Sequence, residues 1–576
     1  MQASATEVTE EQQEIFDYEP YGMVITAPAG CGKTEALAYR AKGLLERYDF
    51  SRNGRRLLIT SFTNQAKDNI NGRLKKYIGV QTLREHVTVC NFHGLASRII
   101  KAHGRLIGIG SDWTLANVDW VGRELRVGGY GWNDSERARQ VLRDAKLTCL
   151  TDDNVMKQLE GAVGQAGEIA RKIEKKRIDE KMISYDDQIR VALWLLSDHR
   201  VADLYRNHFF AALVDEFQDL TPQQLRFVKA LCGENITFAG DIAQSIYSFA
   251  GADVAYVQQE IAKDSGRQIK LQIKLLKSFR SAPAVLNAVN SLSPMTGSEH
   301  LRAAFPSRWG SGGFVGLASF DNEGREAAWV ADMSKSILRH CPRQRIGIIT
   351  RLDNRAITLK RTLTQNKIEY TDWKSGIFRP EVAGVLSDIC SDIQAQTFEN
   401  DLESLQYIQQ RAATYHVGQA EELEEGCGWL FDQLFQRGFD LSKVHEIKEK
   451  ITVRRGNETI ATHEGIHCLT GHAGKGQQFD WVFVLGLEDG TIPDFRAKSP
   501  ESKCEEARVL SVMISRARIG VFGTYTKGRV DRWGNCHKNA PSEFIGYLKK
   551  APGFLRGKDA IETWCGKADW PAIALM

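Results

Sequence analysis

A short apolar run followed by a small-residue loop constrains this chain more than any other stretch. Residues 23–26 predict a buried strand, residues 27–34 (Ala-Pro-Ala-Gly-Cys-Gly-Lys-Thr) a loop and residues 35–40 the start of a helix. This layout is typical of a phosphate-binding loop, in which glycines let backbone amides face phosphate oxygens and the helix N-terminus adds positive charge. The strict pattern has Gly where Ala27 stands. The alternative, a tight turn with a surface lysine, leaves the Lys-Thr pair at the helix start unexplained.

This loop predicts a site for ATP and Mg²⁺. Lys33 would reach the β- and γ-phosphates, and the Thr34 hydroxyl would bind Mg²⁺. The loop residues that we expect to contact the nucleotide are Ala29, Gly30, Cys31, Gly32, Lys33 and Thr34.

The rest of the chain predicts an α/β protein. Its 576 residues are enough for several domains. Buried strands are predicted at 57–61, 87–90, 209–214 and 236–239, and a second series at 314–317, 345–349, 466–469, 481–485 and 521–523. Helical stretches separate them, which indicates largely parallel sheets. We therefore expect two α/β cores in tandem, each with an inserted, mainly helical piece.

Composition narrows the setting of the protein. The 76 basic and 72 acidic residues give a net charge of +4, so any nucleic-acid-binding surface must be local. The 11 cysteines include no CxxC pair, which favours reduced thiols and a cytoplasmic location. No apolar run approaches the ~18 residues of a membrane span, so no membrane partner is expected.

Hydrolytic residues are predicted directly after two of these strands. Asp215 follows the strand at 209–214 and would hold Mg²⁺, and Glu216 would orient and deprotonate the attacking water. Gln244 follows the strand at 236–239, where open α/β sheets bind ligands, and would sense the γ-phosphate. The aromatic rings of Tyr247 and Phe249 offer faces to bases, although core packing is the commoner fate of such rings.

These motifs, in this order, resemble those of superfamily 1 DNA helicases of the UvrD/Rep/PcrA type. The resemblance spans nearly the whole chain. It comprises residues 8–12 (Q motif), 27–34 (motif I), 60–66 (Ia), 91–96 (Ib), 183–187, 215–221 (II), 240–252 (III), 275–281 (IV), 469–479 (V) and 505–517 (VI). It implies two RecA-like domains: 1–99 with 201–290, and 291–385 with 460–548. It also implies a helical insertion at 100–200, a reduced helical insertion at 386–459 and a tail at 549–576.

The resemblance also implies roles for individual residues. Gln12 and Gln478 would contact the adenine edge and the ribose, Phe279 would stack on adenine, and Arg280 and Arg516 would meet the γ-phosphate, Arg516 as an arginine finger. The implied contacts to single-stranded DNA are Phe62, Thr63, Asn64, His93, Tyr247, Phe249, Thr470 and His472. Positions that depart from the family pattern are Glu35, Asn91, Ile242, Ala250 and Gln478.

The implied activity is ATP-driven movement on single-stranded or tailed duplex DNA, with 3′-to-5′ polarity. In size and trimmed insertion the chain also resembles the UvrD-like subunit of Gabija anti-phage systems, which implies a nuclease partner. Two alternatives remain at this point: an ATPase that senses DNA and regulates a partner nuclease, and a DNA-binding module with decayed catalysis. Intact Lys33, Glu216 and Arg516 argue against decay.

Overall fold

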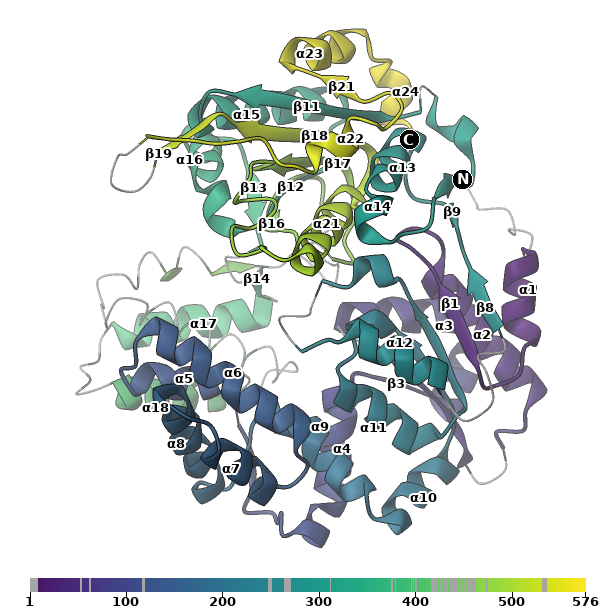
Figure 1. Ribbon diagram of the computed structural model, residues 1–576, viewed down its shortest axis with the longest axis vertical. Helices are drawn as coiled ribbons and strands as arrows, with labels where there is room; N and C mark the ends of the chain where they lie inside the picture. Colours follow the sequence, from purple (N-terminus) through teal and green to yellow (C-terminus); the bar gives the residue numbers. More distant parts are fainter. Residues whose placement is uncertain are drawn as a thin grey trace.

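The computed structural model shows two parallel β-sheets, each covered by helices, in an upper and a lower-right lobe of the view in Figure 1. The structure describes residues 9–576 apart from 52–53, 62–63, 117–119, 247–250, 264–270, 311, 374–376, 379, 395, 397, 399–400, 454–462, 473–474, 531–535 and, within 416–450, all but 423, 427, 430, 434, 444, 447 and 448.

The first sheet has six parallel strands in the order β3-β2-β6-β7-β1-β8. They are β1 (Met23–Thr26), β2 (Arg56–Thr60), β3 (Val87–Cys90), β6 (Phe209–Asp215), β7 (Ile236–Gly240) and β8 (Leu271–Lys274). The central strands are nearly continuous apolar runs because helices bury both faces of the sheet. Those helices are α1 (Glu10–Asp17), α2 (Lys33–Arg47), α3 (Asn64–His86), α4 (Phe92–His103), α10 (His199–His208), α11 (Pro222–Cys232) and α12 (Val254–Lys263).

A helical insertion leaves the first core after α4 and returns at α10. It contains α5 (Trp120–Val127), α6 (Trp132–Thr148), α7 (Asp152–Glu160), α8 (Gln165–Asp179) and α9 (Asp187–Leu196), with the short strands β4 (Thr114–Leu115) and β5 (Met182–Ile183). Besides an apolar core, a buried charge network joins these helices. Its three cations and three anions are Lys146, Arg177, Arg190, Asp152, Glu174 and Asp187. The three carboxylates lie close enough to hold a metal ion, but the three cations already neutralise them.

The second sheet has seven parallel strands in the order β13-β16-β12-β17-β18-β11-β21. They are β11 (Phe314–Phe320), β12 (Arg345–Thr350), β13 (Tyr370–Asp372), β16 (Gly465–Thr470), β17 (Phe479–Leu485), β18 (Ala517–Thr526) and β21 (Leu555–Arg556). Helices α15 (Glu323–His340), α16 (Ile357–Gln365) and α21 (Pro500–Ile514) belong to this core. The predicted α/β class with two parallel-sheet cores is confirmed.

Two predicted boundaries differ from the packing. The sequence places helix α13 (Pro283–Ser291) in the first core, but its apolar side lies in the hydrophobic cluster of the second core. The Ala282 amide donates to Arg518 O on β18 at 2.7 Å. The boundary at 290 is therefore wrong. The misleading signal was the Pro/Ser/Gly-rich patch from Ser291 to Gly313, which includes α14 (Ser293–Thr296) and lies within the second core.

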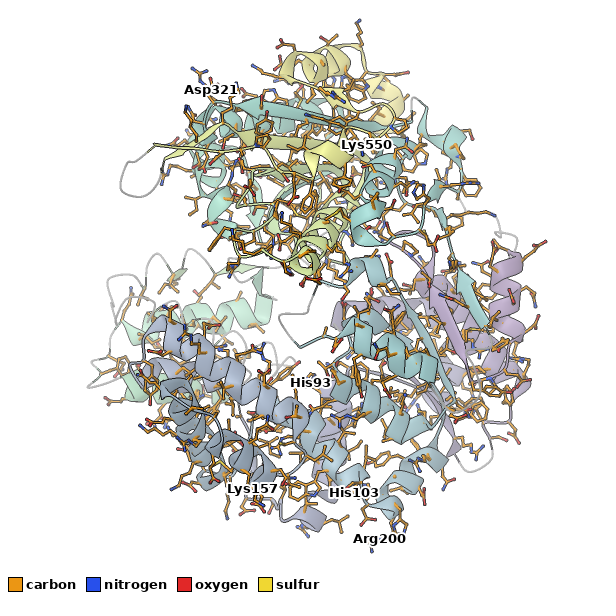
Figure 2. The ribbon with its side chains drawn as sticks, in the orientation of Figure 1. His93, His103, Lys157, Arg200, Asp321 and Lys550 are labelled. Atoms are coloured by element: carbon orange, nitrogen blue, oxygen red, sulfur yellow. The ribbon has the colours of Figure 1, made fainter. Side chains whose placement is uncertain are left out.

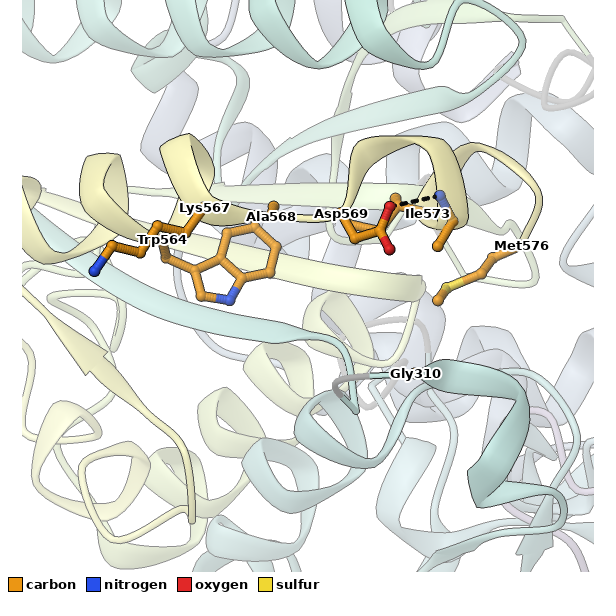
Figure 3. A pocket seen from close by; sticks show the side chains of 8 residues that line it. Gly310, Trp564, Lys567, Ala568, Asp569, Ile573 and Met576 are labelled. Carbon is orange, nitrogen blue, oxygen red and sulfur yellow. Dashed lines mark hydrogen bonds between the residues drawn. The ribbon is translucent and has the colours of Figure 1, made fainter.

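The segment predicted as a tail is part of the second core. Strand β21 pairs with β11, and α23 (Lys558–Lys567) and α24 (Trp570–Ala574) follow it. The Trp570 ring stacks on His340 with ring centroids 5.0 Å apart. The two helices border a pocket of about 270 Å³, shown in Figure 3 and lined by Gly310, Trp564, Lys567, Ala568, Asp569, Ala572, Ile573 and Met576.

The second insertion contains α17 (Pro380–Ile393) and α18 (Asp401–Ala413), which share a small hydrophobic cluster of their own. The ten cysteines described in the structure are all free thiols. None of the described helices combines the length and the hydropathy that a membrane crossing requires.

Candidate active site

The phosphate-binding loop lies between β1 and α2, as the sequence predicts. Gly30 and Gly32 have φ angles of 82° and 84°, in the left-handed region that favours glycine. Gly30 also faces the connector between the two cores: its carbonyl accepts the Phe279 amide at 2.9 Å. A Cβ at Gly30 would lie 2.5 Å from the Arg280 Cβ, so glycine alone fits this contact.

Two carboxylates hold the lysine of the loop. Lys33 Nζ lies 2.9 Å from Asp215 Oδ1 and forms a second ion pair with Glu216. Burial lowers the pKa of Lys33, but the two carboxylates outweigh it and raise the pKa above its ordinary value. Burial raises the pKa of Glu216, yet Lys33 and Lys475 outweigh this and hold it at about 2, so Glu216 is ionised at neutral pH.

Glu216 has a constrained position. Its φ of 54° is unusual for a residue other than glycine, and such strain persists only where the surroundings impose it. Its carboxylate accepts a hydrogen bond from Gln218 Nε2 at 2.6 Å, and Gln218 Oε1 accepts the Asp241 amide at 3.0 Å. The Glu216 side chain is therefore tied to the loop that follows β7.

The arginine of the second core reaches this same loop. Arg516, directly before β18, is buried, and its Nε donates to Val512 O at 2.9 Å. Its Nη2 lies 3.4 Å from Gln244 Oε1, and Gln244 Nε2 donates to Asp241 Oδ2 at 2.8 Å. The structure thus brings Arg516 and Gln244, which are far apart in the sequence, into one site.

Lys475 is a second bridge between the cores, and sequence reasoning gave it no role. Its ammonium group pairs with Asp219 and donates to Gln244 O at 2.8 Å. The Lys475 side chain is 9% exposed and that of Asp219 only 2%. Burial raises the pKa of Asp219 to about 7, against the opposing effect of Lys475. The sequence signal for this role was a lysine between two glycines shortly after β16. Its partner, Asp219, lies 256 residues away in the sequence, so the pairing has no local signature.

Arg280 has an unused donor beside the loop. Its Nη1 is buried and has no hydrogen-bond partner among the described residues. Burial also lowers the pKa of Arg280 to about 10. Such a donor suits an anion, and the loop glycines suit a phosphate. The residues present therefore fit ATP, with Thr34 and Asp215 as the groups that would hold Mg²⁺.

The other predicted nucleotide contacts surround this centre. Phe279 is 47% exposed and meets Phe305 edge-on at 5.9 Å, which leaves ring surface for a base. Gln12 caps α1 together with Thr9, and Gln478 is exposed. Buried Cys31 has a pKa raised to about 12 by burial and by Asp241. Ala29 lies in the loop between β1 and α2.

Glu35 stands where the resembled family has a cation. Its carboxylate accepts a hydrogen bond from Tyr77 and lies 3.4 Å from Arg73 Nη1. Both partners come from α3, so the negative charge next to the phosphate loop is partly neutralised.

Four of the eight predicted DNA contacts can be placed in part or in full. His93, labelled in Figure 2, stacks on Tyr185 with ring centroids 3.8 Å apart. Thr470 ends β16, and His472 follows it; burial lowers the pKa of His472 to about 4. Asn64 begins α3. The predicted contacts that lie outside the described residues are Phe62, Thr63, Tyr247 and Phe249.

Together the fold and the described residues are those of a two-core nucleotide-binding protein, in which Arg516 and Lys475 of the second core contact the first core near its phosphate-binding loop. Comparisons with known proteins agree. Residues 8–264 match the UvrD/REP helicase N-terminal domain, and residues 393–528 match the UvrD-like helicase C-terminal domain. The ATP-dependent DNA helicase PcrA of Staphylococcus aureus is 22% identical, covering 96% of this chain and 87% of its own length. The PcrA helicase of Staphylococcus epidermidis is 23% identical, covering 98% of this chain and 88% of its own length.

The chain therefore belongs to the UvrD-like helicases of superfamily 1, a family of ATP-hydrolysing enzymes.

Proposed function

We propose that this protein is an ATP-dependent DNA helicase that moves along single-stranded DNA as its two cores close on ATP and part after hydrolysis. One observation carries the proposal: Lys33, Asp215 and Glu216 come from the first core, while Arg516 and Lys475 come from the second and bond to the first. Hydrolysis at such a seam changes the contacts between the cores. The relatives named as ATP-dependent DNA helicases support DNA as the substrate.

Phosphoryl transfer depends on positioning and on stabilising charge. Mg²⁺ bound by Thr34 and Asp215 would supply positive charge at the phosphate oxygens. Lys33 from the loop and Arg280 from the connector would bind the same oxygens. Glu216, ionised at neutral pH, accepts a proton or hydrogen bond from the attacking water. Arg516 would bring a further cation from the second core.

The DNA side of the proposal rests on the family resemblance. The stacking residues would be Phe62, His93, Tyr247 and Phe249, and the backbone contacts Thr63, Asn64, Thr470 and His472. Stacking accepts any base, so binding should be indifferent to sequence and weakened by salt. The polarity that we propose is 3′ to 5′.

The proposal is tested with Glu216→Gln and a matched control, Glu160→Gln, on the exposed end of α7. ATP turnover is measured with and without single-stranded DNA, followed by unwinding of duplexes with 3′ or 5′ tails. Wild type and E160Q should hydrolyse ATP faster with DNA and unwind the 3′-tailed duplex. E216Q should do neither while still binding DNA. DNA-stimulated hydrolysis by E216Q at the wild-type rate would refute the role of Glu216.

A second candidate is a DNA-sensing ATPase that regulates a partner nuclease in anti-phage defence. It is favoured by the small size of the second insertion, where about 80 residues separate Phe378 from His463. The free thiols of the described cysteines support a cytoplasmic setting for either activity. DNA-stimulated turnover without unwinding, together with co-purification of a nuclease, would favour this second function.

A further inference from the structure

An acidic side chain stands directly beside the phosphate-binding loop, where the ligand is itself an anion. Glu35 is the acidic residue in the first turn of α2, two positions after Lys33 and so about 3 Å further along the helix axis. Lys33 already has two carboxylate partners, Asp215 and Glu216. An unbalanced carboxylate at this place would repel the phosphates of ATP, so nucleotide binding requires a cation that balances Glu35.

The cation beside Glu35 is Arg73 of α3. Arg73 Nη1 lies 3.4 Å from Glu35 Oε2, and α2 and α3 lie side by side (Figure 1). The next residue, Leu74, is fully buried in the hydrophobic cluster that the two helices share, whereas the Arg73 side chain is 53% exposed. The backbone of Arg73 is therefore fixed, while its half-exposed guanidinium has room to turn.

Glu35 has a second partner that does not depend on Arg73. The hydroxyl of Tyr77, one turn further along α3, donates a hydrogen bond to Glu35 Oε1. The Tyr39 ring packs on the Tyr77 ring with centroids 4.8 Å apart, which holds the two helices together at this point. Burial and the hydrogen bond to Glu35 raise the pKa of Tyr77, so its hydroxyl stays a donor at neutral pH. Glu35 therefore keeps a hydrogen bond when Arg73 leaves it.

We propose that Arg73 is a phosphate-binding residue of the ATP site: its guanidinium leaves Glu35 and binds the phosphate chain of the nucleotide, while Tyr77 holds the Glu35 carboxylate. The inference rests on the proposed function, because it adds a binding residue to the same site. A guanidinium binds two phosphate oxygens at once, and ATP carries more negative charge than one carboxylate. The 3.4 Å contact with Glu35 is longer than a charge-assisted hydrogen bond, so little is lost when it breaks.

The test is a double-mutant cycle on the full chain with Arg73→Ala and Glu35→Gln, made singly and together. The Kd is measured by titration with a fluorescent, non-hydrolysable ATP analogue in the absence of DNA, so the readout is binding and not turnover. A second series displaces the analogue with adenosine, which has no phosphate. Lys75→Ala is the control, since it removes one positive charge from an exposed position of the same helix.

The cycle has a definite expected result. R73A should raise the Kd of the ATP analogue about tenfold in the wild-type and the E35Q background alike, the low end for a hydrogen bond to a charged group because Arg73 is half exposed. E35Q alone should lower this Kd about two- to fivefold, because it removes a repelling charge and releases Arg73. R73A should leave displacement by adenosine within about twofold, and K75A should match wild type.

The outcomes separate the two proposals. If wild type binds no ATP analogue, the proposed function fails. If wild type binds it and R73A changes the Kd only when Glu35 is present, Arg73 merely neutralises Glu35, and its role as a phosphate ligand is overturned. No change in either background overturns that role as well. An equal loss of adenosine affinity would also overturn it, because the contact would then be with the base or the ribose.

Discussion

Replacement of Lys475 by Met tests whether the bridge between the cores is needed for hydrolysis. The ammonium group pairs with buried Asp219 and donates to Gln244 O, and both partners belong to the first core. Removing one partner of a buried pair costs about 3–5 kcal/mol. Because about 1.4 kcal/mol is a factor of ten, the contact of the two cores at this bridge should become roughly 10²- to 4 × 10³-fold rarer. We expect kcat/KM for ATP, with DNA present, to fall by a similar factor.

The pKa of Asp219 predicts how the effect of Lys475→Met depends on pH. Burial raises the pKa of Asp219 to about 7, so its carboxyl is largely protonated below that pH and the ionic bond forms as pH rises through it. The ratio of wild-type to K475M activity should therefore be larger at about pH 8 than at about pH 6. Lys335→Met, an exposed lysine on α15, is the control and should behave as wild type. A K475M rate within threefold of wild type at both pH values would refute the bridge.

Two further predictions concern stability and reactivity. Asp187→Asn should destabilise the helical insertion by about 3–5 kcal/mol, because it leaves the buried cations Lys146, Arg177 and Arg190 short of an anion. Urea denaturation checks this when unfolding of the insertion is detected as cleavage within residues 100–200 in limited proteolysis. A D187N variant whose insertion unfolds at the same urea concentration as in the wild type would contradict the prediction. Cys31 should react with iodoacetamide roughly 10³-fold more slowly than an exposed thiol, because burial raises its pKa to about 12. Mass spectrometry of the labelled peptide measures the rate, and labelling as fast as that of an exposed thiol would show that the loop opens.

The sequence predicted the central strands and the loops after them. Apolar runs such as 209–214 and 481–485 form buried parallel strands, because helices cover both faces of each sheet. The edge strands β8, β13 and β21 were missed, since they are short and lack such a run. The position of α13 in the second core could not be predicted, because the local sequence of a helix does not show which of two sheets it packs against.

Contacts within one sequence motif, or between neighbouring strand ends, could be predicted from the sequence. Contacts between motifs that are far apart in the sequence could not. The roles proposed for Lys33, Asp215 and Glu216 come from their positions after predicted strands, and the structure brings these three side chains into contact. The pairing of Lys475 with Asp219 joins segments 256 residues apart and has no local signature. Stacking of Tyr185 on His93 joins the helical insertion to α4 in the same way.

In the proposed mechanism, hydrolysis depends on Arg516 acting on ATP that is held by the first core. The most direct measurement is single-turnover hydrolysis by Arg516→Ala at saturating single-stranded DNA, with ATP affinity determined separately. Arginine fingers contribute about 10³–10⁵-fold to the rate, so we predict a loss of at least about 10³-fold, with ATP still bound by Lys33 and its loop. Hydrolysis by R516A at the wild-type rate would contradict a site shared by the two cores.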